Sequence, residues 1–217
     1  VLETEINEKN NPVFKLESLS RMQGLDSSDA HSALIDATLT AKILSIIKKR
    51  QPSTWDMFLR TANKLDTETI FKKEEIFSLN EYFYGKSRLY LCAPLHPKHC
   101  IHPVYNWGQC VDIRVDIEPI LNMSINELKV EMKKTPKFLR TIRSNKAPII
   151  LDAEYAMKVE PYNAMDSSLI KKRAKLVRDN EKFSQNILIA LREIAEEKEQ
   201  SKSQEDIYAE ESIYNKF

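Results

Sequence analysis

Hydrophobic residues recur every three or four positions in five stretches of the chain, which is the spacing of one face of an α-helix. A short stretch places Leu16, Leu19 and Met22 on one face and closes at Gly24. A longer one over residues 34–47 runs into basic residues and ends at Pro52. The same spacing predicts helices over residues 54–65, 120–133 and 167–199.

Between these helices, short runs of mixed alternation indicate β-strands. They cover residues 76–79, 88–93, 110–117 and 147–151, and turn residues such as Gly85, Pro97 and Gly108 separate them. Short strands at this spacing are typical of a small barrel or sheet. We therefore expect an α+β fold, in which helices precede, interrupt and follow a small β-barrel or sheet.

Composition narrows the class of protein. With 217 residues, 42% hydrophobic residues and a mean hydropathy of −0.46, the chain reads as globular and soluble. Three glycines are too few for a P-loop or a GxGxxG fingerprint, and no apolar run is long enough to span a membrane. The first residue is Val1 and no secretory signal opens the chain, so we expect a piece of a longer cytoplasmic protein. Three cysteines without framework spacing agree with a reducing compartment.

Charge is unevenly distributed although the net charge is only +1. Residues 129–178 hold thirteen basic and five acidic residues, whereas residues 192–217 hold four basic and eight acidic ones. One basic block in a nearly neutral chain indicates a local anionic partner. A solvated face of lysine-rich helices explains the same block equally well.

His31 and Asp36 are the first candidates for chemistry. On one continuous helix they would lie about 140° apart around the axis, so they share a cleft only if His31 lies on the turn before the helix. A nuclease needs such a pair, because a carboxylate can hold a divalent metal while an imidazole takes a proton from the attacking water. Taken alone, the pair is more typical of a capping histidine and a carboxylate at a helix start.

The surrounding segments resemble a known family. Residues 14–19, then Gly24-Leu25 and residues 30–38 (Ala-His-Ser-Ala-Leu-Ile-Asp-Ala-Thr), resemble the third motif of DEDDh exonucleases. The continuation, Ala41-Lys42 and Arg50-Gln51-Pro52, resembles the bacterial exodeoxyribonuclease I family in particular. Further segments agree in order: residues 92–97, 111–112, 120–121, 145–151, 177–180 and 212–217.

The resemblance implies a fold and an activity. Residues 1–51 would be the C-terminal end of a ribonuclease H-like exonuclease domain, residues 52–199 an SH3-like domain with helical insertions, and residues 200–217 a linker and the start of a helical domain. The implied activity is 3′-to-5′ degradation of single-stranded DNA to nucleoside 5′-monophosphates in DNA repair and recombination, with two Mg²⁺ ions. His31 would be the general base and Asp36 a metal ligand.

The family's first two acidic motifs have no counterpart in this sequence. Glu3-Thr4-Glu5 has the spacing of the first motif but lies on no plausible strand. One carboxylate rarely holds Mg²⁺ against its water shell. We therefore expect this chain alone to be inactive, and to guide DNA rather than cleave it.

In the family, the SH3-like domain guides single-stranded DNA and helps bind the acidic, Phe-ended tail of the single-stranded-DNA-binding protein. A basic rim suits both ligands. The candidates for these contacts are Lys15, Lys158, Lys171 and Arg178, with Lys172 and Arg173 nearby. Met57 and Asp152 depart from family residues and weaken the tail-binding interpretation. We expect a monomer.

Two other interpretations stay open. The chain could be a non-catalytic module that binds single-stranded DNA or acidic tails. Alternatively, the histidine-rich loop could hold zinc, although its spacing fits no common zinc pattern: His96, His99, Cys100 and His102 would then have to converge. Aromatic residues of the strand region, among them Tyr82, Phe83 and Tyr90, are candidates for base stacking, with a core role as the alternative.

Overall fold

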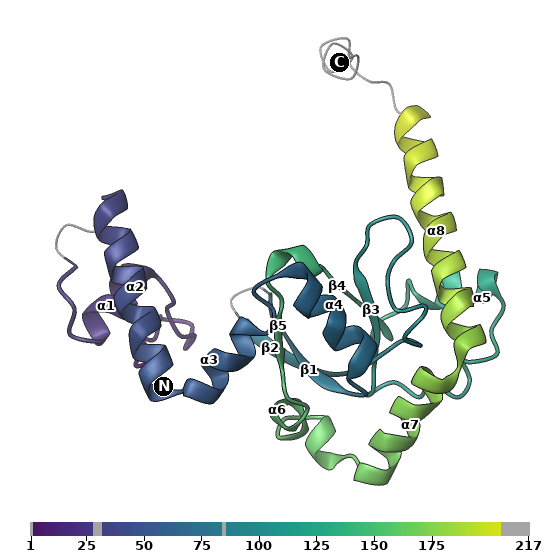
Figure 1. Ribbon diagram of the computed structural model, residues 1–217, viewed down its shortest axis with the longest axis horizontal. Coiled ribbons are helices and arrows are strands. Elements are labelled where there is room, and N and C mark those ends of the chain that lie inside the picture. The colour runs from purple at the N-terminus through teal and green to yellow at the C-terminus, as the bar shows by residue number, and fades with distance from the viewer. Residues whose placement is uncertain (1, 28–31, 84–85, 205–217) are drawn as a thin grey trace.

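The N-terminal part of the chain is a small helical unit. The computed structural model describes residues 2–27, 32–83 and 86–204, with side chains up to residue 200. Helices α1 (Leu16–Met22) and α2 (Ala33–Arg50) pack on each other, and α3 (Pro52–Leu59) leads from them to the sheet (Figure 1). Pro52 begins α3 at a position where a missing backbone N–H costs nothing, and it separates α3 from α2.

A five-stranded sheet forms the centre of the larger unit. Its order is β4-β3-β2-β1-β5, and every paired neighbour is antiparallel. The bounds are β1 (Phe77–Phe83), β2 (Lys86–Pro94), β3 (Gly108–Asp112), β4 (Leu139–Ile142) and β5 (Ile149–Leu151). Tyr90 lies opposite Leu79, and Arg140 lies opposite Cys110.

Helices surround this sheet (Figure 1). α4 (Lys64–Lys73) packs near β3, α6 (Glu154–Met157) packs on β1 and β2, and α7 (Ser167–Asp179) packs on β2. α5 (Ile125–Glu131) packs on α8 (Glu181–Gln204), and two 3-10 turns cover Ser144–Lys146 and Tyr162–Ala164. The core between these elements includes Phe71, Phe77, Phe138 and Phe183, all buried.

The expected α+β class is confirmed at this level, while the ribonuclease H-like and SH3-like assignments stay predictions. The pattern over residues 167–199 covers two helices, because the Asn180 side chain accepts a hydrogen bond from the Phe183 N–H and starts a new one. The strand expected over residues 110–117 ends at Asp112, whose carboxylate accepts the Arg114 N–H in a turn. None of the described helices has the length and apolar content that a membrane span requires.

Candidate nucleic-acid interface

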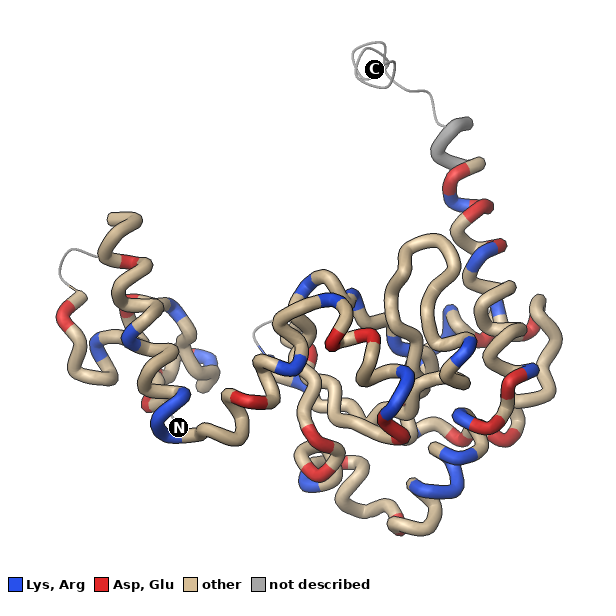
Figure 2. The backbone as a smooth tube through the Cα atoms, in the orientation of Figure 1, with Lys and Arg blue, Asp and Glu red and all other residues tan. Residues whose placement is uncertain are grey.

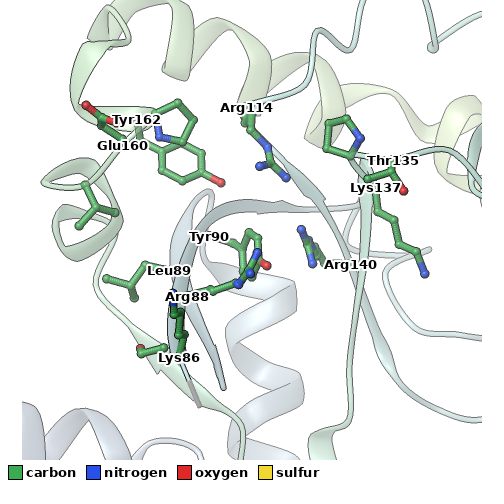
Figure 3. A pocket seen from close by; sticks show the side chains of 14 residues that line it. Lys86, Arg88, Leu89, Tyr90, Arg114, Thr135, Lys137, Arg140, Glu160 and Tyr162 are labelled. Carbon is green, nitrogen blue, oxygen red and sulfur yellow. The ribbon is translucent and has the colours of Figure 1, made fainter. Parts of the chain in front are cut away.

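A basic pocket of about 660 Å³ opens beside the first half of β2 (Figure 3). Alternate residues of a strand point to the same face, so Lys86, Arg88 and Tyr90 project together. Arg114 follows β3, Arg140 comes from β4, and Lys137 precedes β4. Side chains that are far apart in sequence thus meet at one edge of the sheet.

Asp112 lies behind the lining of this pocket and holds three of its side chains, Tyr162, Arg114 and Arg140. Its side chain is completely buried and accepts hydrogen bonds from the Tyr162 hydroxyl at 2.7 Å and from the Arg114 guanidinium at 2.9 Å. Arg140 adds an ion pair with Asp112 at 3.6 Å and one with Glu81 at 3.3 Å. A buried carboxylate needs such partners, since an unpaired buried charge is strongly destabilising.

This network shifts the protonation of its neighbours. Burial raises the pKa of the Tyr162 hydroxyl well above its usual range, and the Asp112 charge beside it acts in the same direction. Burial also raises the pKa of the Glu81 carboxyl, against the opposing effect of Arg140. The raised pKa favours the protonated hydroxyl, which is the form that donates to Asp112.

Tyr90 is not available for stacking on a base. Its side chain is buried, and the guanidinium carbon of Arg140 lies over its ring at 3.6 Å from the centroid. Two aromatic residues at the end of β1 are exposed, Tyr82 at 56% and Phe83 at 46%. The Tyr82 ring packs edge-on against Phe14, whereas Phe83 lies opposite Lys86 across the β1–β2 pair. Phe83 therefore offers a stacking surface next to the basic pocket.

Three of the basic side chains have no carboxylate partner among the described residues. Lys86, Arg88 and Lys137 are exposed and form no ion pair with the described residues, whereas Arg114 and Arg140 are engaged with carboxylates. Five basic groups and three carboxylates (Glu81, Asp112 and Glu160) leave an excess of two positive charges. Elsewhere, basic and acidic positions are mostly interspersed, apart from basic stretches at the end of α2 and on α7 (Figure 2).

The structure separates Asp36, the predicted metal ligand, from this pocket. His31 lies outside the described residues, and Asp36 is half-buried in the first turn of α2, in the N-terminal helical unit. Lys15 is exposed directly before α1. Among the described residues, no group of three or more metal-ligating side chains includes Asp36. The described residues therefore do not by themselves form a two-magnesium centre.

The predicted binding residues of the basic block are scattered. Lys158 is exposed and pairs with Glu154 at 3.3 Å, and Lys171 is exposed on α7. Arg178 is half-buried, and its guanidinium donates hydrogen bonds to the carbonyl oxygens of Phe71 at 3.2 Å and of Lys72. None of the three lines the basic pocket. Their roles in binding stay predictions.

Sequence reasoning missed the basic groups of the pocket. The signal was present in β2, where Lys86 and Arg88 alternate with Ser87 and Leu89 and so share a face. The strand was expected to begin only at Arg88, which left Lys86 outside it. β4 was not expected, so although Lys137 and Arg140 belong to the basic block of residues 129–178, nothing placed them beside β2.

The four ligands of the zinc interpretation do not converge. Cys100 is buried and its thiol donates to the Pro97 carbonyl oxygen at 3.5 Å. The His102 Nδ1 accepts the backbone N–H groups of Val104 at 3.1 Å and Tyr105 at 3.3 Å. Only His96 and His99 come together, and the group that joins them is Glu181 of α8.

No protein-family model matches the chain, but parts of known proteins are similar to it in sequence. Exodeoxyribonuclease I of Buchnera aphidicola is 25% identical over 193 residues, which cover 81% of this chain and 44% of that protein. Exodeoxyribonuclease I of Escherichia coli is 23% identical over 161 residues, covering 68% of this chain and 33% of that protein. The chain thus spans less than half the length of these curated relatives.

Solved structures show the same relationship at the level of the fold. Exonuclease I from Methylocaldum szegediense aligns with a TM-score of 0.65 at 19% identity and covers 88% of this chain and 43% of that one. E. coli Exonuclease I in complex with a dA16 oligonucleotide aligns with a TM-score of 0.61 at 20% identity, with the same coverage. The resemblance found in the sequence is therefore confirmed, and the chain is related in sequence and in fold to part of exodeoxyribonuclease I.

Proposed function

We propose that this chain is the DNA-guiding part of an exodeoxyribonuclease I-like nuclease and that the basic pocket contacts the phosphates of single-stranded DNA. The observation that carries the proposal is the set of three exposed side chains without ion-pair partners in the described structure, Lys86, Arg88 and Lys137, at one edge of the sheet. Cations that have no carboxylate partner gain most from binding a phosphate, because no existing pair has to be broken.

Phe83 supports a single strand over a duplex as the ligand. Unpaired bases expose their faces, and stacking on an aromatic side chain is tolerant of sequence. Phe83 lies opposite Lys86, so a phosphate on Lys86 brings the adjoining base near the exposed ring. This combination of a basic groove and one stacking group is typical of sequence-independent binding to single strands.

We further propose that the complete protein is a 3′-to-5′ exonuclease acting in DNA repair and recombination, with His31 as general base and Asp36 as a Mg²⁺ ligand. Residues 1–51 would then end the exonuclease domain, residues 52–199 would be the SH3-like domain, and residues 200–217 would lead to a helical domain. The present chain alone would bind DNA as a cytoplasmic monomer without cleaving it.

The acidic tail of the single-stranded-DNA-binding protein is the alternative ligand. One structure similar in fold, with a TM-score of 0.60 at 19% identity, is a complex of ExoI with SSB-Ct. The exposed cations of the pocket suit either ligand, and its apolar lining residues, Leu89 and Val159 among them, offer a contact for a terminal Phe, so a competition experiment has to separate the two ligands.

The test is a fluorescence-anisotropy titration of labelled oligo(dT) with the wild-type chain and a Lys86→Ala/Arg88→Ala variant. We expect the double variant to bind about tenfold more weakly. The two lost phosphate contacts together should cost about 1.4 kcal/mol of binding free energy, which corresponds to a tenfold change in affinity. A Lys64→Ala/Lys73→Ala variant, with two exposed lysines on α4 outside the pocket, is the matched control.

Three outcomes separate the candidates. A loss confined to the pocket variant supports the proposal, and equal losses in both variants would mean that only net charge matters. Displacement of the DNA by an unlabelled acidic, Phe-ended peptide, at concentrations at which a peptide without the Phe has no effect, would favour the tail as the ligand. Release of nucleotides by the wild-type chain with Mg²⁺ would contradict the proposed inactivity.

A further inference from the structure

A second cluster of polar side chains lies where the loop after β2 meets the start of α8. The Nε2 atom of His99 is 3.1 Å from Oε1 of Glu181, and the Nε2 atom of His96 is 3.9 Å from Oε2 of the same carboxylate. The ligand atoms of the three residues all lie within 4.8 Å of one another. Two imidazoles and one carboxylate are a ligand set that binds zinc in several enzymes, with water in the fourth position.

Local structure holds the two histidines in place. The His99 N–H donates to the His96 carbonyl oxygen at 2.7 Å, which closes a turn and brings both rings to one side. The His96 N–H donates to the hydroxyl of Ser184 at 3.0 Å, and Ser184 is fully buried on α8. The loop is therefore fixed to the helix that supplies the third ligand.

Both rings also point the correct nitrogen toward the carboxylate. The Nδ1 atom of His96 accepts the Lys98 N–H at 3.4 Å, which leaves Nε2 facing Glu181. The Nε2 atom of His99 faces both Glu181 and the side-chain amide of Gln185, one turn further along α8, at 3.3 Å. The side chains of His96 and His99 are 19% and 25% exposed, so the cluster is partly enclosed but open to an ion from solvent.

We propose that His96, His99 and Glu181 bind one divalent cation of the zinc class and thereby clamp the loop after β2 to α8. In a tetrahedral zinc site the ligand atoms lie about 3.3 Å apart, so small side-chain rotations bring this cluster to that geometry. Water would complete the coordination. The site lies past the far end of β2 from Lys86, and it stands independently of the proposed DNA binding.

Lys98 provides a further test of the proposal, because it pairs with one of the proposed ligands. Its ammonium lies 3.6 Å from Oε1 of Glu181 and is 72% exposed. In the metal-free protein it therefore competes for the carboxylate that the metal needs. Lys98→Ala should strengthen metal binding, whereas Glu181→Gln should weaken it.

The experiment is isothermal titration calorimetry of the full chain with ZnCl₂, supported by the visible absorption of bound Co²⁺. We expect one ion per chain, binding that is about tenfold or more weaker in His99→Ala and in Glu181→Gln, and a rise in the unfolding temperature with zinc. The absorption of tetrahedral Co²⁺ in the wild-type protein tests the geometry without any substitution.

His102→Asn is the matched control, because His102 lies in the same loop but outside the cluster. It should leave zinc binding unchanged. The proposal is overturned if the wild-type chain shows no saturable zinc binding. Unchanged binding in a His96→Ala/His99→Ala double variant, or equal loss in His102→Asn, would overturn it as well.

Discussion

Arg178 illustrates how a single residue predicted to bind a partner is held by the fold. Its guanidinium donates to the carbonyl oxygens of Phe71 and Lys72, which lie in the last turn of α4 and have no partner within the helix. A cation at this end of a helix also interacts favourably with the helix dipole. Arg178 thus connects α7 to α4.

Arg178→Ala should therefore lower the free energy of unfolding by about 1 to 3 kcal/mol, because hydrogen bonds from a charged donor are lost. Urea unfolding followed by circular dichroism measures this change. Lys171→Ala, an exposed change on the same helix, should alter the stability by less than about 0.5 kcal/mol. Weaker DNA binding of Arg178→Ala at unchanged stability would instead support a direct role in binding.

His102 makes stability depend on pH. Burial lowers the pKa of its imidazole from the ordinary value of 6.5, so the unfolded chain binds the proton more tightly than the folded one. The stabilisation is complete above pH 6.5 and is lost as the pH falls through the lowered folded-state pKa. Protonation of Nδ1 would also break its bonds with the N–H groups of Val104 and Tyr105.

His102→Asn should reduce this dependence, since the amide oxygen of Asn can accept the same N–H groups and does not titrate. Comparing the urea midpoints of both proteins at pH 5 and pH 7 tests the prediction, because the other histidines are common to both. An equal loss of stability on acidification in the two proteins would assign the effect to another group.

At the scale of elements, Gly108 determines how closely β3 approaches α4. A Cβ atom at this position would lie 2.1 Å from Cε2 of Phe71, whose side chain is completely buried. Gly108→Ala should therefore lower the free energy of unfolding by about 1 to 3 kcal/mol through overpacking. Adding Phe71→Leu should recover part of this loss, as expected for two residues in contact.

Gly24 provides the contrasting case. Nothing lies within 4 Å of a Cβ atom there, but its φ of +73° is a conformation that costs other residues about 1 kcal/mol or more. Gly24→Ala should therefore lower the stability, and adding Phe71→Leu should not recover any of this loss. Thermal unfolding of Gly108→Ala and Gly24→Ala, each with and without Phe71→Leu, separates steric overlap from backbone strain. Equal recovery of stability by Phe71→Leu in both backgrounds would contradict this assignment.

Periodicity predicted the elements whose apolar faces are long and regular. The helix over residues 34–47 and the strands around β1, β2 and β5 lie near the expected positions. β4 was not predicted, because its four residues, Leu139–Ile142, include Arg140 and Thr141 and show no clear apolar pattern. It is a strand because it forms hydrogen bonds with β3. A strand that depends on its neighbour leaves little trace in a local pattern.

The sequence did not predict the basic pocket for a related reason. Its cations come from β2, β4 and the segments that follow β3 and precede β4, and only the sheet brings them together. Local charge density pointed instead to the basic run on α7, where Arg173 donates to the carbonyl oxygens of Ile113 and Arg114, and Lys172 pairs with Glu118. Counting charges along a chain does not show which of them are already paired.

At the scale of the whole molecule, the catalytic prediction and the binding pocket occupy different units. Asp36 lies in the N-terminal helical pair, which α3 joins to the sheet, and the pocket lies on the sheet itself (Figure 1). The N-terminal part also contacts the sheet through Phe14, whose ring centroid lies 6.1 Å from that of Tyr82. If the proposed pocket binds DNA, this binding should not require the predicted catalytic residues. His31→Ala should leave the affinity for oligo(dT) within about twofold of the wild-type value, which the anisotropy titration measures. A tenfold loss would mean that DNA also contacts the helical unit.

The measurement that tests the central claim most directly is the salt dependence of oligo(dT) binding by the wild-type chain and by a Lys86→Ala/Arg88→Ala/Lys137→Ala variant. Each phosphate contact contributes a slope of about −0.7 to the plot of log affinity against log salt concentration for single strands. If the three side chains bind phosphates, the slope of the variant should be shallower by about 2. Identical slopes would show that single-stranded DNA does not bind in this pocket.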